Sequence, residues 1–172
     1  ARAFHGYPDD QYRQGMKVMI LKARRNSASP VSGIKSLNYL DNILGKMEIE
    51  KKGYGEGLFL NDRGHIACGT VSNIFFVRSN RIYTPPLSAG ILPGITRQMV
   101  LRKTAPVVGC KAVEKNILPQ DIDTYQEAFL TNSLMGVMPV QRIGKKVFRN
   151  RKYTDALIAA YKEYTEKRAA RI

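Results

Sequence analysis

The stretch GLFLNDRGHIACGTVSNIFFVRSNRIYT, residues 57–84, decides the fold. It contains four short runs rich in apolar residues, at 58–60, 66–68, 73–78 and 81–84. Asn-Asp-Arg-Gly separates the first two runs and Ser-Asn separates the last two, and such residues between short apolar runs are typical of hairpin turns. We therefore expect strands here that pair mainly with their neighbours in antiparallel fashion.

The rest of the chain supplies further strands and three helices. The pattern predicts strands at 17–22, 107–113, 127–131 and 139–143, and helices that begin near Leu37, at Ile95 (to Thr104) and at Thr154 (to Arg168). In the first helix the apolar positions recur with a helical period from Leu37 to Met47, Ser36 is a candidate N-cap, and Gly53 ends it. Hairpin strands with interspersed helices predict a mixed, largely antiparallel α/β domain of the α+β type.

The composition is that of one ordinary globular domain. The chain has 172 residues, of which 44% are hydrophobic and 24% are charged. No apolar run approaches the ~20 residues of a membrane span, and the start ARAFHGYPDD has no signal-peptide core. We expect residues 1–14 to be a loosely attached lead-in and, because the sequence lacks an initiator methionine, the chain to be a fragment or a processed product.

Two thiols and a strong positive charge complete the bulk description. Cys68 and Cys110 share no motif spacing, and two histidines are too few for a zinc site with them, so we expect reduced thiols in a cytoplasmic protein. The formal charge is +14, from 28 basic and 14 acidic residues. Because the basic residues are dispersed, a solvated face, or one that meets an anionic substrate or an acidic missing segment, explains the charge as well as nucleic acid does.

Lys35 lies in VSGIKSLNYLDN, residues 31–42, directly before the expected first helix. Most lysines are simply solvated at the surface. A lysine at the positive end of a helix can instead be held as a neutral amine, which is the form that makes a Schiff base. The spacing leaves both interpretations open.

Two other stretches resemble cups for an anion. In AGILPGITRQMV, residues 89–100, Gly94 precedes a helix whose first turn holds Ile95 and Thr96, so that free N–H groups and a hydroxyl meet. In AFLTNSLMGVMPV, residues 128–140, a strand ends at Thr131, Asn132 and Ser133. An ordinary capped helix and an ordinary turn are the structural alternatives.

A reactive lysine and two phosphate cups together imply pyridoxal 5′-phosphate (PLP). The stretches IKSLNYLDNILGKMEI, GTVSNIFFV, IYTPPLSAGILPGITRQMV and FLTNSLMGVMPV resemble the ordered motifs of the class IV aminotransferases, the fold-type IV PLP enzymes. The resemblance runs from about residue 17 to residue 167. It implies the barrel-like, mixed sheet of the large domain of enzymes like D-amino-acid aminotransferase.

The resemblance assigns roles to six of these residues. Lys35 matches the lysine that forms the Schiff base with PLP and shuttles a proton, and Leu92 matches the residue that packs on the ring. Ile95 and Thr96 match the phosphate-binding pair, and Ser133, with Asn132, matches the second phosphate contact.

Cys68 is the departure from the family pattern. Its position normally holds a glutamate that pairs with the pyridine nitrogen and keeps it protonated. A thiol is shorter and is neutral unless its pKa is lowered from about 8.5. Cys68 therefore predicts a weakened electron sink, in a slower enzyme or in one that tolerates a neutral pyridine.

Length is the other departure, because family members also have a smaller N-terminal domain that supplies an arginine to the phosphate. We expect residues 1–16 to lead in from that missing domain and residues 17–172 to form the C-terminal PLP-binding domain. The active site would lie between the domains near a homodimer interface, and the missing domain would complete it.

The subclass follows from two motifs. KSLNYLDN and LMGVMPV resemble most closely the 4-amino-4-deoxychorismate lyases, which release pyruvate and form 4-aminobenzoate for folate synthesis. Branched-chain or D-amino-acid aminotransferase activity on a small amino substrate is the first alternative. A degenerate, non-catalytic domain and a nucleic-acid-binding module are the alternatives from other classes, and we expect neither a specific nucleic-acid partner nor a membrane.

Overall fold

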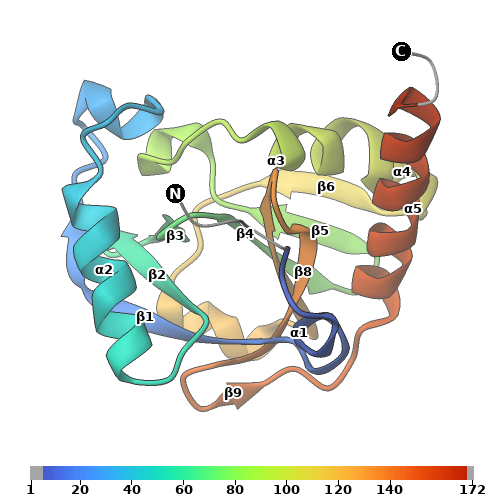
Figure 1. The fold of residues 1–172 in the computed structure, drawn as a ribbon, viewed down its shortest axis with the longest axis horizontal. Coiled ribbons are helices and arrows are strands. Elements are labelled where there is room, and N and C mark those ends of the chain that lie inside the picture. The colour runs from blue at the N-terminus through green and yellow to red at the C-terminus, as the bar shows by residue number, and fades with distance from the viewer. Residues whose placement is uncertain (1–5, 170–172) are drawn as a thin grey trace.

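A computed structural model describes residues 6–169, and its nine described strands form one curled sheet with helices around it (Figure 1). The strands follow the order β3-β2-β1-β8-β7-β4-β5-β6, and β9 pairs with β8. Their bounds are β1 (Met16–Arg25), β2 (Glu56–Asn61), β3 (Ile66–Gly69), β4 (Asn73–Arg78), β5 (Arg81–Thr84), β6 (Lys111–Glu114), β7 (Glu127–Asn132), β8 (Gly136–Ile143) and β9 (Lys146–Val147).

The pairing is mixed, and antiparallel contacts predominate as the turns predict. The antiparallel pairs are β2–β3, β4–β5, β4–β7, β7–β8 and β8–β9, whereas β1 pairs in parallel with both β2 and β8, and β5 pairs in parallel with β6. The predicted fold class is therefore confirmed, and both predicted hairpins form.

Alternating side chains of the strands fill two cores. In β4, Ile74 and Phe76 belong to the core inside the curl, together with residues of β1, β2 and β8. Phe75 and Val77 face the other way, into a core shared with Leu157 of a C-terminal helix. Because both faces of β4 are covered, its sequence is a continuous apolar run rather than an alternating one.

The helices cover the outside of the sheet (Figure 1). Their bounds are α1 (Asp9–Gln14), α2 (Leu40–Lys51), α3 (Ile95–Met99), α4 (Ala105–Val107) and α5 (Lys152–Ala169). A π-helical turn, Val100–Thr104, joins α3 to α4, and short 3₁₀ turns occupy Pro30–Gly33, Leu87–Ala89 and Pro119–Thr124. Within residues 6–169 no helix is long and apolar enough to cross a membrane.

The expected start and N-cap of the first helix are wrong. The helix begins at Leu40, with Tyr39 in the N-cap position, while Ser36 accepts a hydrogen bond from the Asn38 N–H instead. The face toward the sheet consists of Asn42, Gly45 and Ile49. Gly45 permits this close packing, since a Cβ there would lie 3.0 Å from Leu21 and 3.1 Å from Phe59 and Thr70.

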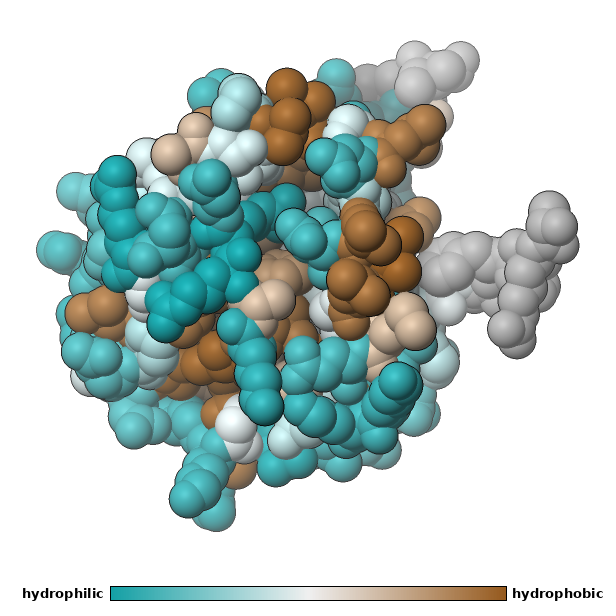
Figure 2. All heavy atoms as spheres, turned by 90° about the vertical axis from the view of Figure 1, so that its left-hand side faces the viewer, coloured by the Kyte–Doolittle hydropathy of each residue, from teal (hydrophilic) through white to brown (hydrophobic). Residues whose placement is uncertain are grey.

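The apolar residues that show the helical period are consequently exposed. The exposed fraction is 103% for Leu37, 62% for Leu40, 52% for Ile43, 55% for Leu44 and 48% for Met47. We call these five residues the α2 patch. Figure 2 faces this side of the molecule and shows hydrophobic side chains among hydrophilic ones.

Two further expectations need correction. The predicted strand at 107–113 is helix and turn until Gly109, whose φ of +72° turns the chain, and the strand proper is Lys111–Glu114. The lead-in is not loose in its described part, because residues 9–14 form α1 and the Tyr12 hydroxyl donates a hydrogen bond to the Met135 carbonyl at 2.9 Å. Residues 1–5 lie outside the described part of the chain.

Candidate active site

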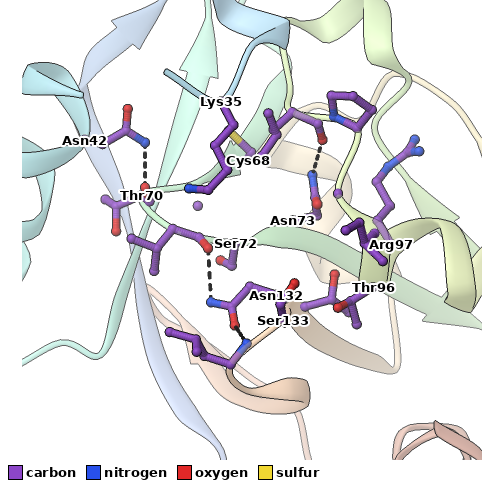
Figure 3. A pocket seen from close by; sticks show the side chains of 18 of the residues that line it. Lys35, Asn42, Cys68, Thr70, Ser72, Asn73, Thr96, Arg97, Asn132 and Ser133 are labelled. Atoms are coloured by element: carbon purple, nitrogen blue, oxygen red, sulfur yellow. Dashed lines mark hydrogen bonds between the residues drawn. The ribbon is translucent and has the colours of Figure 1, made fainter. Parts of the chain in front are cut away.

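A cavity of about 700 Å³ opens where five segments of the chain converge (Figure 3). They are the end of β1, residues 33–42, the turn after β3, the residues around the start of α3 and the turn after β7. All seven site residues predicted from the sequence line this cavity: Lys35, Cys68, Leu92, Ile95, Thr96, Asn132 and Ser133.

A buried carboxylate shapes the turn after β3. Glu56, on β2, is 1% exposed and accepts five hydrogen bonds. One oxygen accepts from the Gly57 N–H (2.8 Å) and from the Thr70 N–H (2.9 Å) and hydroxyl (2.5 Å). The other accepts from the Ser72 hydroxyl (2.7 Å) and the Val71 N–H (3.3 Å). This carboxylate therefore fixes one wall of the cavity from behind.

Two glycines allow the walls to approach closely. A Cβ at Gly69 would lie 2.2 Å from the Ser72 hydroxyl and 2.8 Å from the Glu56 carboxylate. A Cβ at Gly94 would lie 2.3 Å from the Asn73 side-chain oxygen. A Cβ at either position would force these hydrogen-bonded side chains to shift, so glycine allows the walls to approach as closely as they do.

Three asparagine side chains tie the segments together. Asn42 of α2 donates to the Thr70 carbonyl at 2.5 Å, and Asn73 of β4 donates to the Leu92 carbonyl at 3.0 Å. Asn132, at the end of β7, donates to the Val71 carbonyl at 3.1 Å, and its own oxygen accepts from the N–H groups of the following turn. The predicted role of Asn132 as an anion contact thus competes with a bracing role that the structure shows directly.

One end of the cavity is rich in hydrogen-bond donors. Gly94 is the N-cap of α3, as predicted, so that N–H groups of the first turn are free, and Thr96 is 2% exposed beside them. At the same end of the cavity, Ser133 lies two residues after Thr131, whose hydroxyl is buried without a hydrogen-bond partner among the described residues. A buried hydroxyl without a partner is costly, and a bound polar group would satisfy it.

Lys35 projects toward the cavity, in the middle of the view in Figure 3. Its ammonium lies 5.1 Å from the centre of the Tyr39 ring. Because α2 begins only at Leu40, the expectation that Lys35 directly precedes the helix start is wrong. An exposed amine on an irregular segment is nevertheless able to reach a bound carbonyl compound.

Cys68 lies on the wall of the cavity in contact with a cation that was not among the predicted residues. A guanidinium nitrogen of Arg25, the last residue of β1, donates to the Cys68 sulfur at 3.1 Å, and the guanidinium also lies 5.7 Å from the Phe59 ring centre. Burial raises the pKa of the Cys68 thiol, and Arg25 only partly opposes this effect. The thiol is therefore neutral near pH 7.

The charged side chains that line the cavity, among the described residues, are all basic. Arg25, Lys35 and Arg97 line it, and none of the described residues that line it is Asp or Glu. Arg97 is engaged already, because its guanidinium donates to the Pro85 carbonyl at 2.8 Å and pairs with Glu114. The cavity thus suits an anion.

Sequence reasoning missed Arg25, Glu56 and the buried state of Thr131. The available signal for Arg25 was its place at the end of an apolar strand, and for Glu56 it was a carboxylate at the start of a strand that is otherwise apolar. Neither signal reveals which turn the side chain reaches.

The chain is similar in sequence to known proteins. The sequence model of the family described as amino-transferase class IV matches residues 1–143. The aminodeoxychorismate lyase of Bacillus subtilis is 33% identical over 146 residues, which are 84% of this chain and 50% of that protein.

Two solved structures show the same fold. One from Legionella pneumophila, provisionally named a 4-amino-4-deoxychorismate lyase, has a TM-score of 0.82 and 28% identity, and the match covers 94% of this chain and 58% of that one. The branched-chain amino acid aminotransferase of Thermobaculum terrenum, in its PLP form, has a TM-score of 0.76 and 29% identity over 86% of this chain and 51% of that one. The chain therefore spans about half the length of the relatives it matches.

Proposed function

Because the chain belongs to the amino-transferase class IV family, we propose that its cavity binds PLP and that residues 17–172 are the cofactor-binding domain of an enzyme acting on a small amino substrate. The observation that carries the proposal is the meeting, in one cavity, of the Lys35 amine and a donor-rich end that contains the unpartnered Thr131 hydroxyl. PLP carries an aldehyde and a phosphate on neighbouring ring carbons, and it therefore needs both features at once.

The donor-rich end suits the phosphate. The free N–H groups around Ile95 and Thr96, the Thr96 and Thr131 hydroxyls and Ser133 would surround a dianion, as helix starts with nearby hydroxyls do. The cationic lining adds a favourable potential. Since Asn132 already braces the turn, we assign it an indirect part in this contact.

The chemistry follows from which groups face the ring. PLP, when bound, draws electrons from a bond at the α-carbon of the substrate. Lys35 would hold the cofactor covalently, release it to the amino substrate and then move the proton at that carbon. Leu92 lines the cavity beside Pro93, and it would pack on a face of the ring and exclude water.

Among the reactions of the family we favour the aminodeoxychorismate lyase type. The motifs around Lys35 and residues 134–140 support this choice, as do the lyase relatives. Branched-chain aminotransferase activity is the second candidate, supported by the solved aminotransferase that shares the fold. We also propose a cytoplasmic location.

The α2 patch supports the proposal that further protein covers this side. Leu40, Ile43, Leu44 and Met47 are each about half exposed, and an apolar strip of this kind commonly marks an interface. Four of the five residues of the patch lie on α2, the helix that follows Lys35, and Asn42 of the same helix lines the cavity. We propose that a second subunit and a smaller N-terminal domain complete the site there.

The test is the site of PLP attachment. PLP is added to the purified protein, the linkage is reduced with borohydride, and peptide mass spectrometry locates the adduct. We expect an absorbance band of bound PLP and an adduct at Lys35. The variant Lys35→Ala should lose both, whereas Lys51→Ala, an exposed lysine on α2 outside the cavity, should keep both.

Two results would contradict the proposal. One is the absence of any bound PLP at saturating concentration. The other is an adduct distributed over surface lysines, with no preference for Lys35, because it would show that the amine is not activated by its surroundings.

A further inference from the structure

The described part of the chain places no acidic side chain on the lining of the cavity, where it could hold a cation. Of the described residues that line it, three are basic, and none is Asp or Glu. A ring nitrogen of PLP becomes positively charged when it binds a proton. That charge would therefore meet cations and dipoles in this cavity, but no carboxylate.

Glu56 cannot replace the missing carboxylate. It lies behind the turn formed by Gly69 and Thr70 and does not line the cavity. Its two oxygens already accept five hydrogen bonds from that turn and from Gly57. To serve a ring nitrogen it would have to abandon several of these bonds, which are stronger than ordinary hydrogen bonds because the acceptor is charged.

Cys68 does not supply the anion either. Its thiol is 4% exposed, and burial raises its pKa, so that it is neutral near pH 7. The group beside it is the permanently charged guanidinium of Arg25, 3.1 Å from the sulfur. A fixed positive charge within about 4–6 Å of a titrating nitrogen disfavours its protonated form.

The other charged groups do not change this balance. Lys35 is itself basic, and Arg97 is paired with Glu114, which does not line the cavity. Glu56 is near enough to raise the pKa of Cys68, yet its influence is smaller than those of burial and of Arg25.

We propose that this cavity holds the ring nitrogen of PLP without a proton, and that the positive charge of the Arg25 guanidinium keeps that nitrogen unprotonated. The inference rests on the proposed function and adds a residue to the site. A neutral ring withdraws electrons less strongly from the substrate than a protonated one. The protein would therefore stabilise a negative charge at the α-carbon less than a carboxylate-equipped site does.

The experiment observes the nitrogen directly. PLP labelled with ¹⁵N in the ring is bound to the protein, and its ¹⁵N chemical shift is followed through neutral pH. We expect the shift of an unprotonated, hydrogen-bonded pyridine in the wild type and in Cys68→Ser. Cys68→Glu, which places a carboxylate beside Arg25, should give the shift of a pyridinium.

A second pair of variants isolates Arg25. In Arg25→Gln the apparent pKa of the ring nitrogen should rise by about one to three units, because a neighbouring cation is removed. Arg24→Gln is the matched control, since Arg24 is exposed, lies outside the cavity and donates to the Asn61 carbonyl. It should leave the shift unchanged.

Every other outcome contradicts one part of the inference. A pyridinium shift in the wild type would refute the inference, and its loss in Cys68→Ser would assign the role to a thiolate. An unchanged shift in Arg25→Gln would remove Arg25 from the account, and an unprotonated nitrogen in Cys68→Glu would show that a carboxylate is not what is missing. If Cys68→Glu fails to fold, the wild type and Arg25→Gln still decide. If the protein binds no PLP at all, the proposed function itself is wrong.

Discussion

Replacing Glu56 by Gln should weaken both the fold and the cavity. The amide keeps one oxygen, which can retain the three donors from Gly57 and Thr70, but its NH₂ group then faces the Val71 N–H and the Ser72 hydroxyl. The hydroxyl can rotate and accept, whereas the Val71 N–H cannot. One unsatisfied N–H, together with the loss of charge assistance in the remaining bonds, should cost about 2–4 kcal/mol.

The assay combines urea unfolding with PLP titration. Unfolding gives the change in the free energy of unfolding, and titration of the folded fraction gives affinity, which we expect to fall about tenfold, or ~1.4 kcal/mol, as the turn shifts. Glu127→Gln is the matched control: this carboxylate is also 1% exposed, but it caps α5 through the Tyr153 and Thr154 N–H groups, outside the cavity.

The control separates general stability from the shape of the cavity. Glu127→Gln should lower stability and leave PLP affinity unchanged. The reasoning fails if Glu56→Gln changes stability by less than about 0.5 kcal/mol, the range of an ordinary surface substitution. It also fails if both variants lower PLP affinity equally.

Three more predictions concern the Thr131 hydroxyl, the α2 patch and the two cysteines. Thr131→Val should leave stability unchanged or raise it by up to about 1 kcal/mol, because the hydroxyl has no partner, and yet weaken PLP binding; a clear loss in thermal unfolding temperature would contradict this. Leu44→Glu, at a residue 55% exposed, should change stability by less than about 0.5 kcal/mol but reduce self-association in sedimentation, and unchanged association would remove the α2 patch from the interface. Burial raises the pKa of both Cys68 and Cys110, so these thiols stay neutral in the folded chain after they ionise in the unfolded one. Stability should therefore decline as the pH rises above about 9, and urea midpoints that stay constant through that range would contradict the assignment.

Much of the fold could be predicted because its strands are short and are separated by residues typical of turns. The hairpin β4–β5 has the predicted bounds, since both strands are apolar and the Ser79-Asn80 turn allows a positive φ of 56° at Ser79. The family, predicted from motif resemblance, is confirmed by the match over residues 1–143. PLP stays a prediction for this chain, and it agrees with a relative solved in its PLP form. Local patterns were enough for these conclusions.

The errors arose where distant contacts decide. The period of Leu40, Ile43 and Leu44 predicted a helix, but these residues are exposed, and α2 packs through Gly45 because a small residue allows closer approach than a large one. A hydrophobic pattern cannot tell a face that covers this domain's core from one left for another partner. Which of the two a face does depends on whether another domain or subunit packs against it.

For the site, too, local features could be predicted from the sequence and long-range contacts could not. The loops that line the cavity could be located from glycine and hydroxyl residues, and all seven predicted residues lie there. The contact between Arg25 and Cys68 joins residues 43 positions apart, and the reach of Glu56 to Ser72 spans 16. Both depend on strand register, which composition does not specify.

The position of β1 in the sheet has a consequence for the order of folding. Met16 pairs with Val140 and Val18 with Ile143, so that β1 gains its second neighbour only when the chain has been synthesised almost to its last helix. Contacts of such sequence separation form slowly, and until they form the edges of β1 and β7 that β8 covers are open to other chains. A ribosome-bound chain that stops before β8 should therefore be the form most prone to aggregate, while adding β8 should protect it without any help from the cofactor.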